Sequence, residues 1–393
     1  METATLDAVR EPAASSQAGD TRVAWIFPSL ARGYYWQPIF KEFAARCPNT
    51  VVFTCIWPGF APGYEKAFEV CTLRGLGYVD VRKRLPDARR GFIWTPLSIL
   101  KKLASFRPDV IFASGFSGWT LCALLFRAFG RSRVIIFWEG CSVHANGSLR
   151  IQTAFRRGVA RFADAAVSNG GEGIQYLREV IGMPPQKLLC HPCQVPDLPL
   201  LCSGGAESNP CQTRRPVFLY VGGLTWRKGW RYLMEATVLL VSQGFKDFSV
   251  VFVGAGEQEE EMRTTIRAYG LEDIVHQEGA VAYHKLGSYY SSADVFVSPT
   301  RQDTWGVAIL EAMAFGKPVL CSKHAGARQM IVQGENGFVF DPADTPQLAD
   351  YMAKFIQDPG LAVRMGARSR EKMAPFTPQS AADVLANLAV QTS

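Results

Sequence analysis

The feature that most constrains this fold is an alternation of short apolar runs and helix-period segments that occurs twice along the chain. Runs typical of buried strands in the first half are Val23–Phe27, Val51–Thr54, Val110–Ala113, Val134–Phe137 and Ala165–Val167. Helix-period segments such as Trp36–Arg46 and Leu97–Phe106 lie between them. Strands that alternate with helices predict a parallel sheet covered by helices.

The alternation stops over residues 198–216, where Pro, Ser, Gly, Asn, Gln and Cys dominate as in an interdomain linker. It resumes with Val217–Val221, Val250–Val253, Val295–Val297 and Val319–Leu320. A chain of 393 residues also suits two cores better than one. We therefore predict an α/β protein with two Rossmann-like doubly wound domains, residues 21–197 and 217–375, across a cleft. A disordered leader (1–20) and a C-terminal helix (376–393) complete it, and the sequence does not indicate where that helix docks.

Composition is that of a soluble globular protein, with 48% apolar and 20% charged residues. The most apolar stretch, Val110–Phe126, is interrupted by Ser-Gly pairs and predicts a strand, a turn and a helix. The leader lacks a basic-then-apolar signal pattern, so we expect a cytoplasmic protein with reduced thiols. Cys190 and Cys193 have zinc-ligand spacing, but eight residues separate Cys202 from Cys211 in the linker, so we expect thiols and no metal.

Positive charge is concentrated in the first half. The whole chain has 42 Lys/Arg and 35 Asp/Glu residues. Residues 1–200 hold 24 of the basic and 15 of the acidic residues, which leaves 18 basic and 20 acidic residues for 201–393. This half suits an anionic partner, such as the inner face of a membrane or a phosphorylated acceptor; diffuse solvated charge explains it equally well. Basic and aromatic residues mix over Arg82–Trp94, as at an anionic membrane surface. No recognition motif supports nucleic acid as a partner.

Two motifs follow buried strands in the second half. In the first, Val221–Gly229, glycines let the backbone approach a ligand and Arg227 and Lys228 can hold a diphosphate. The alternative is a surface turn with solvated cations. In the second, Ser298–Ala314, a helix starts near Thr304, and Asp303 or Thr304 suits its N-cap. Its N–H groups would form an anion site, with Asp303 and Glu311 both toward the cleft. The alternative is that Asp303 only caps the helix and that Glu311 is only an acidic residue on the helix surface.

These motifs, with Val253–Glu257, Tyr289-Tyr290 and Glu335–Phe338 in order, resemble the retaining GT-B glycosyltransferases of family 4, the glycosyl transferases group 1. In that family a Gly-Arg-Leu…Lys-Gly loop binds the donor diphosphate, and a Glu-x7-Glu element binds the donor sugar and ribose. The resemblance implies catalytic roles for Lys228, Arg227, Asp303 and Glu311. Its other donor-binding residues are Gly222, Gly223, Gly254, Thr304, Trp305, Gly306 and Val307.

The match has departures. Gly223 stands where the family has arginine, so Arg227 is the candidate substitute, and Asp303 replaces a glutamate, which implies an unusual donor. On the acceptor or sugar side, the resemblance assigns Gly33 and Tyr34. It also assigns either Glu139, which stands where the family commonly has a histidine, or His144, five residues later. For His144, the alternative is a loop histidine with no catalytic role.

The implied activity is retaining transfer of a sugar from a nucleoside-diphosphate sugar to a carbohydrate or lipid-linked acceptor hydroxyl. We expect this in cell-surface polysaccharide or glycolipid synthesis. The sugar nucleotide is a substrate, and UDP-sugars are the commonest donors in the family. No cofactor is expected. Two alternatives stay open, a nucleotide-sugar-binding protein without transferase activity and a GT-B epimerase. A dinucleotide fingerprint at Gly254 lacks its third glycine, replaced by Glu259.

Overall fold

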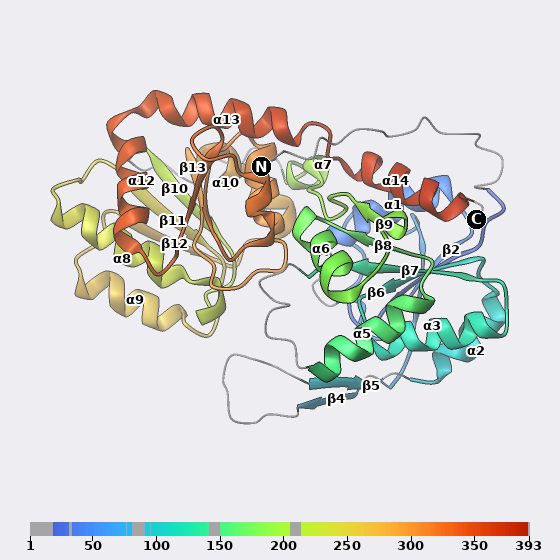
Figure 1. The fold of residues 1–393 in the computed structure, drawn as a ribbon. Helices are drawn as coiled ribbons and strands as arrows, with labels where there is room; N and C mark the ends of the chain where they lie inside the picture. The colour runs from blue at the N-terminus through green and yellow to red at the C-terminus, as the bar shows by residue number, and fades with distance from the viewer. Residues whose placement is uncertain are drawn as a thin grey trace.

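The computed structural model describes residues 19–30, 34–75, 96–140, 150–204 and 214–391, and the backbone of residues 77–80 and 91–94. Two parallel sheets form separate lobes of the molecule (Figure 1). Each sheet begins with its central strand, so chain order reverses beside that strand in both lobes. The predicted pair of doubly wound domains is therefore what the described residues form.

The N-terminal sheet has seven parallel strands in the order β3-β2-β1-β6-β7-β8-β9. Its strands are β1 (Val23–Phe27), β2 (Thr50–Thr54), β3 (Glu69–Thr72), β6 (Val110–Ser114), β7 (Arg133–Trp138), β8 (Ala165–Ser168) and β9 (Leu188–Cys190). Its helices are α1 (Gln37–Arg46), α2 (Ser98–Phe106), α3 (Gly118–Ala128), α5 (Arg150–Phe162) and α6 (Gly171–Gln175), followed by a π-helical turn (Tyr176–Ile181). A separate antiparallel pair joins β4 (Gly77–Asp80) to β5 (Gly91–Trp94).

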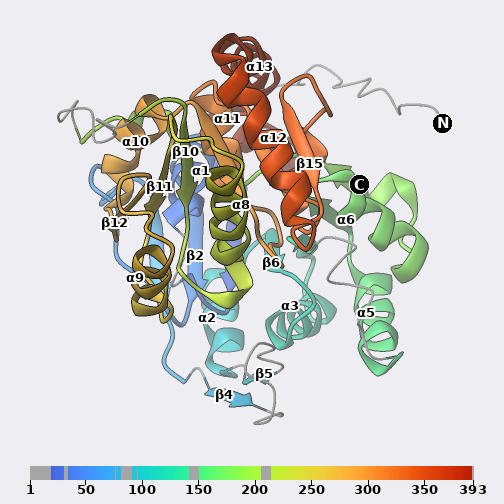
Figure 2. The ribbon, with the colours of Figure 1, turned by 90° about the vertical axis from the view of Figure 1, so that its left-hand side faces the viewer.

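The C-terminal sheet has six parallel strands in the order β12-β11-β10-β13-β14-β15. Its strands are β10 (Val217–Val221), β11 (Ser249–Val253), β12 (Val275–Gly279), β13 (Val295–Ser298), β14 (Val319–Ser322) and β15 (Gly337–Phe340). Its helices are α8 (Trp230–Ser242), α9 (Glu259–Ala268), α10 (Leu286–Ser292), α11 (Val307–Ala314), α12 (Thr345–Gln357) and α13 (Pro359–Met373). Helices α8, α9 and α12 cover one face (Figure 2), and α10 and α11 cover the other.

Buried side chains on both faces of each sheet form the cores. In the N-terminal lobe, Trp25 of β1 stacks on Phe112 of β6 with ring centroids 4.1 Å apart, and Phe40 and Phe43 of α1 meet it edge-on. Such large apolar side chains contribute most of the hydrophobic stabilisation. β1 is fully buried and β10 is buried except at its last residue, which explains why their sequences are continuous apolar runs.

The C-terminal helix α14 (Pro378–Val390) crosses back to the N-terminal lobe and packs on α1 (Figure 1). Its Ala382 and Leu385 are fully buried there. Arg46 of α1 pairs with Asp383 at 2.5 Å. Arg133 donates to the carbonyl oxygens of the last turn of α14, which stabilises the negative end of that helix. The docking site that the sequence left open is thus the outer face of α1.

Candidate functional site

The sequence-predicted donor residues lie on two loops beyond neighbouring strands. One loop follows β10 and the other follows β13, and these two strands pair in parallel at the point where strand order reverses. Ligands of doubly wound sheets bind outside the carboxyl ends of the strands at this point. The topology therefore gives the two loops a position suited to a ligand.

Backbone contacts fix the first loop on the second. The carbonyl oxygen of Arg227 accepts from the Arg301 N–H at 3.0 Å and from the Thr300 hydroxyl at 3.1 Å. Gly229 has φ +68°, and a Cβ there would lie 2.2 Å from the Pro299 carbonyl oxygen. Only glycine allows this approach. The residues on either side of Lys228, Arg227 and Gly229, are thus both packed against the second loop.

Lys228, Asp303 and Glu311 form one charged cluster. The Lys228 ammonium donates to Asp303 Oδ2 at 2.5 Å, and both side chains are largely buried. Glu311 is buried on α11, which raises the pKa of its carboxyl group, while a hydrogen bond from Tyr290 and the charge of Lys228 act in the opposite direction. The structure thus brings Lys228 of the first motif together with Asp303 and Glu311 of the second.

Two tyrosines complete the surroundings of Glu311. The Tyr290 hydroxyl of α10 donates to Glu311 Oε2 at 2.6 Å. Burial, and then the negative charge of Glu311, raise the pKa of Tyr283 and of Tyr290 well above its usual value. In the sequence, Tyr290 stood out only as part of the Tyr289-Tyr290 pair in the family resemblance. Its role is invisible there because 21 residues separate it from its partner.

The three glycines predicted to bind the donor near β10 and β11 have different reasons to be glycine. Gly254 has φ +139°, and a Cβ there would lie 1.9 Å from the Gly222 carbonyl oxygen, so its glycine is required by packing between two loops. A Cβ on Gly222 would meet the Tyr220 hydroxyl at 3.2 Å. A Cβ on Gly223 would have only an ordinary contact, 3.6 Å from the Ala255 carbonyl oxygen. The backbone at position 223 therefore accommodates a Cβ, the first atom of the arginine side chain in the family pattern.

The start of α11 corrects one sequence prediction. Neither Asp303 nor Thr304 is the N-cap, because the helix begins at Val307 and Gly306 is its N-cap, with φ +98° and no side-chain cap. Only glycine adopts this left-handed conformation readily, and it turns the chain directly into the helix. Asp303 is left available for Lys228. The helix ends before Gly316, which has φ +69°.

Arg227 and Trp305 make their hydrogen bonds outside this cluster. The Arg227 guanidinium donates to the Gln302 carbonyl oxygen at 2.7 Å. Trp305 is buried in the C-terminal core, and its indole N–H donates to the carbonyl oxygen of Gln194 at 3.2 Å. Arg301, which the sequence analysis did not single out, lies over the Trp226 ring at 3.9 Å from its centroid.

The acceptor-side prediction is only partly within the described residues, because Gly33 and His144 lie outside them, as do Cys211 and the basic residues of 82–90. Tyr34 is exposed and its hydroxyl donates to the Pro58 carbonyl oxygen at 3.3 Å. Glu139, at the end of β7, accepts from the Gln194 amide at 2.7 Å. Burial raises the pKa of Glu139 to about 7, although hydrogen bonds from Trp36 and Gln194 favour its charged form.

Gln194 joins the two sides of the site. Its side-chain oxygen accepts from the Asn169 amide at 2.9 Å, its amide donates to Glu139, and its backbone carbonyl accepts from Trp305. Gln194 and Asn169 are both buried. A second contact between the lobes pairs Arg328 with Glu172, which lies at the start of α6. Hydrogen bonds and an ion pair therefore connect the two lobes at the carboxyl edges of their sheets.

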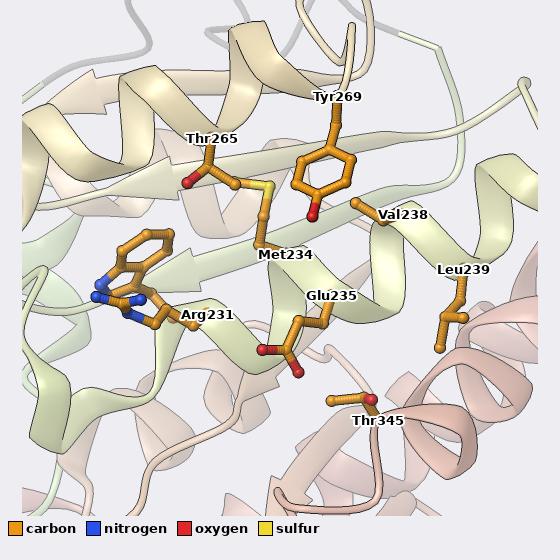
Figure 3. Close-up of a pocket in the computed structure, with 9 residues that line it drawn as sticks. Arg231, Met234, Glu235, Val238, Leu239, Thr265, Tyr269 and Thr345 are labelled. Carbon is orange, nitrogen blue, oxygen red and sulfur yellow. The ribbon is translucent and has the colours of Figure 1, made fainter.

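A further pocket, of about 420 Å³, lies away from this cluster (Figure 3). Met234, Glu235 and Val238 of α8 line it, opposite Tyr269 at the end of α9 and Thr345 at the start of α12. It opens between the helices that cover the sheet, and none of the sequence-predicted site residues line it. We assign it no role in the chemistry.

Known glycosyltransferases are similar to this chain in sequence. Residues 206–372 match the family model described as Glycosyl transferases group 1. The alpha-D-kanosaminyltransferase of Streptomyces kanamyceticus is 31% identical over 175 residues, which are 44% of this chain and 45% of that protein. The GDP-mannose-dependent alpha-(1-6)-phosphatidylinositol monomannoside mannosyltransferase of Mycobacterium tuberculosis is 31% identical over 40% of this chain and 42% of its own length. The matched part thus spans less than half of these curated relatives.

Solved structures match nearly the whole chain. HepE from Anabaena in complex with UDP superposes with a TM-score of 0.71 at 16% identity, covering 94% of this chain and 99% of that one. WaaG, a glycosyltransferase involved in lipopolysaccharide biosynthesis, has a TM-score of 0.63 at 18% identity, over 93% and 99%. The fold is therefore GT-B, and residues 206–372 are similar in sequence to the glycosyl transferases group 1.

Proposed function

We propose that this protein is a retaining glycosyltransferase of family 4, which moves a sugar from a nucleoside-diphosphate sugar to an acceptor hydroxyl. The observation that carries the proposal is the cluster of Lys228, Asp303 and Glu311 beyond β10 and β13, where a doubly wound sheet binds ligands. The printed names of similar proteins, which include a phosphatidylinositol monomannoside mannosyltransferase and a lipopolysaccharide glycosyltransferase, support a role in cell-surface polysaccharide or glycolipid synthesis. The sugar nucleotide is a substrate, and UDP is the first nucleoside diphosphate to test.

Lys228 supplies the charge that the departing diphosphate needs. An ammonium group has three N–H donors, so Lys228 can keep its hydrogen bond to Asp303 and still donate to phosphate oxygens. Asp303 then orients the ammonium as well as contacting the transferred sugar. The N-terminal end of α11, which follows Gly306, adds the positive end of a helix dipole on the same side. Together these groups stabilise the negative charge that develops as the sugar leaves.

Glu311 holds the ribose. Tyr290 donates to one of its carboxylate oxygens, which fixes the orientation of the group. A carboxylate accepts several hydrogen bonds, so Glu311 can also accept from ribose hydroxyls. Binding the ribose would offset part of the cost of burying this charge, the same cost that raises the pKa of Glu311.

Retention requires no protein nucleophile when the leaving phosphate assists the acceptor on the same face of the sugar. The acceptor hydroxyl then approaches from the N-terminal lobe, where Glu139 lies at the end of β7. With a pKa near 7, Glu139 exists in both protonation states at neutral pH and can exchange hydrogen bonds with that hydroxyl. The contacts through Gln194 and Trp305 keep this lobe against the donor loops.

A thermal-unfolding panel with UDP, GDP, ADP, CMP and NAD tests the donor site. A ligand at about 100 times its dissociation constant stabilises the folded state by about 2.7 kcal/mol. We expect one nucleoside diphosphate to do so, and Lys228→Ala to abolish the shift. Lys246→Ala is the matched control, because this exposed lysine precedes β11 at the opposite edge of the sheet. No shift with any diphosphate, or a shift with NAD alone, contradicts the proposal.

Turnover separates transfer from its alternatives. Free nucleotide released from the sugar nucleotide only when an acceptor is present supports a transferase and argues against an epimerase. Donor binding without turnover across many acceptors identifies a binding protein instead. The anomeric configuration of the product, read by NMR, tests retention directly: an inverted product contradicts the family 4 mechanism.

A further inference from the structure

An apolar groove lies on the outer surface of the N-terminal lobe, between α3 and α5 (Figure 1). Its volume is about 730 Å³, and its lining is apolar except for Arg127, which pairs with Asp164. Leu121, Leu125 and Phe155 are among the side chains that line it. Contiguous exposed apolar surface of this kind marks an interaction site in a soluble protein.

Large apolar side chains around the groove face solvent. Leu125 is 55% exposed, Phe129 92%, Ile151 80% and Phe162 61%. On α5, Ile151, Phe155, Gly158 and Phe162 recur at helical spacing and form one stripe. An isolated exposed leucine needs no explanation, but this stripe on one helix beside a second one does.

All charged side chains of α5 are cationic. Arg150, Arg157 and Arg161 share a second stripe next to the apolar one, and α5 contains no acidic residue. All three arginines are exposed. Arg157 also donates to the Val180 carbonyl oxygen, which keeps its stem along the helix surface. A helix with a row of arginines beside a row of Ile and Phe has the composition of an interfacial helix.

We propose that the α3–α5 surface binds the headgroup region of an anionic membrane. A bilayer of anionic lipid offers phosphates to Arg150, Arg157 and Arg161 and an apolar boundary to the adjacent stripe. A second copy of the chain suits the surface poorly, because a two-fold contact through α5 sets these arginines against the same arginines. An acidic protein surface pairs with the arginines and leaves the apolar stripe uncovered.

The position of α5 gives this surface a use. Because α5 connects the parallel strands β7 and β8, its first turn lies at the carboxyl edge of the sheet, the edge that also carries Glu139. Docking through α5 therefore places this edge next to the lipid headgroups. The proposal concerns where the protein works, and its evidence does not depend on the transfer chemistry. No helix in the described part of the chain is long and apolar enough to cross a membrane.

Vesicle co-sedimentation of the full chain tests the proposal, using phosphatidylcholine vesicles with and without about one-third phosphatidylglycerol. We expect binding to the anionic vesicles only, and weaker binding as salt increases. Leu125→Gln/Ile151→Gln/Phe162→Gln should lower the partition coefficient at least about tenfold by removing inserted apolar area. Arg150→Gln/Arg161→Gln should lower it about 30-fold at low salt, since each basic residue near the surface contributes about 1 kcal/mol.

Tyr269→Gln/Val363→Gln is the matched control, because it removes two exposed apolar side chains from the other lobe. It should bind like the parent protein. Equal binding of parent and α3–α5 variants, or no binding of the parent to anionic vesicles, overturns the proposal. A parent dimer that the apolar variant makes monomeric, without vesicle binding, assigns the surface to a second copy. Nucleotide-induced thermal shifts without vesicles should be unchanged in every variant, which separates this test from that of the donor site.

Discussion

Replacing Glu139 by glutamine should remove a pH dependence that this side chain gives to the free energy of unfolding. Burial raises the pKa of Glu139 from 4.5 to about 7 in the folded protein. Between these two values the folded state binds more protons at this site than the unfolded state does. The unfolding free energy therefore falls as pH rises through this window, and the stabilisation is fully present only below the unfolded pKa.

The size of the effect follows from the two pKa values. With 4.5 in the unfolded chain and about 7 in the folded one, linkage predicts a loss of about 2.5 kcal/mol between pH 5 and pH 8. This is an upper limit, because the side chain is partly exposed and water screens part of its charge. Other titrating groups contribute to the same curve but are common to the parent and the variant, so the difference between the two isolates Glu139.

Urea unfolding at pH 5, 6, 7 and 8 provides the assay. Parent and Glu139→Gln should diverge steadily, with the parent losing up to about 2.5 kcal/mol more than the variant over this range. Glu69→Gln is the control, an exposed carboxylate on the edge strand β3, and it should track the parent. Parallel curves for parent and Glu139→Gln would refute the assignment of a raised pKa to this residue.

Three further substitutions test the donor side. Tyr290→Phe leaves the buried Glu311 carboxylate without its 2.6 Å donor, so urea unfolding should show a loss of about 1–3 kcal/mol and calorimetry a weaker nucleotide affinity; unchanged values would show that this hydrogen bond does not hold Glu311. Gly223→Arg should fold with an unchanged melting temperature, because its Cβ meets nothing closer than 3.6 Å, and bind a nucleoside diphosphate about tenfold more tightly by titration calorimetry; a lower melting temperature counts against it. Gly254→Ala should lower the unfolding free energy by more than about 1 kcal/mol, because its Cβ would lie 1.9 Å from the Gly222 carbonyl oxygen; a stable variant would contradict the packing argument.

The central strands could be predicted because their own sequences carry the signal. β1 is buried over its whole length and β10 over its first four residues, and each was predicted residue for residue. The edge strands β3 and β9 were missed, since they are partly exposed and too short or polar to give an apolar run. The same holds for β12, whose sequence Val-His-Gln-Glu-Gly contains a single buried residue. An edge strand is defined by the partner it pairs with, which its own sequence does not contain.

The candidate site divides in a similar way. Lys228, Asp303 and Glu311 could be named because each follows a recognisable strand and lies in a spaced motif, and the structure places them together. The groups that hold them could not be named. Tyr290 reaches Glu311 from another helix, and Gln194 reaches Trp305 from the other lobe, 111 residues away. These contacts depend on how helices and lobes pack, so no local pattern records them.

The polar contacts between the lobes couple the two sides of the site. Asp303 and Trp305 are two residues apart, so the loop that presents a carboxylate to Lys228 is the same loop that sends an indole to Gln194. Gln194 in turn binds Glu139 through its side chain. A change at Glu139, in charge or in contact with an acceptor, therefore has a path of only two hydrogen-bonded residues to the donor loop. If that path carries energy, Glu139→Gln and Trp305→Phe should be non-additive in donor affinity, whereas independent sites would give additive effects.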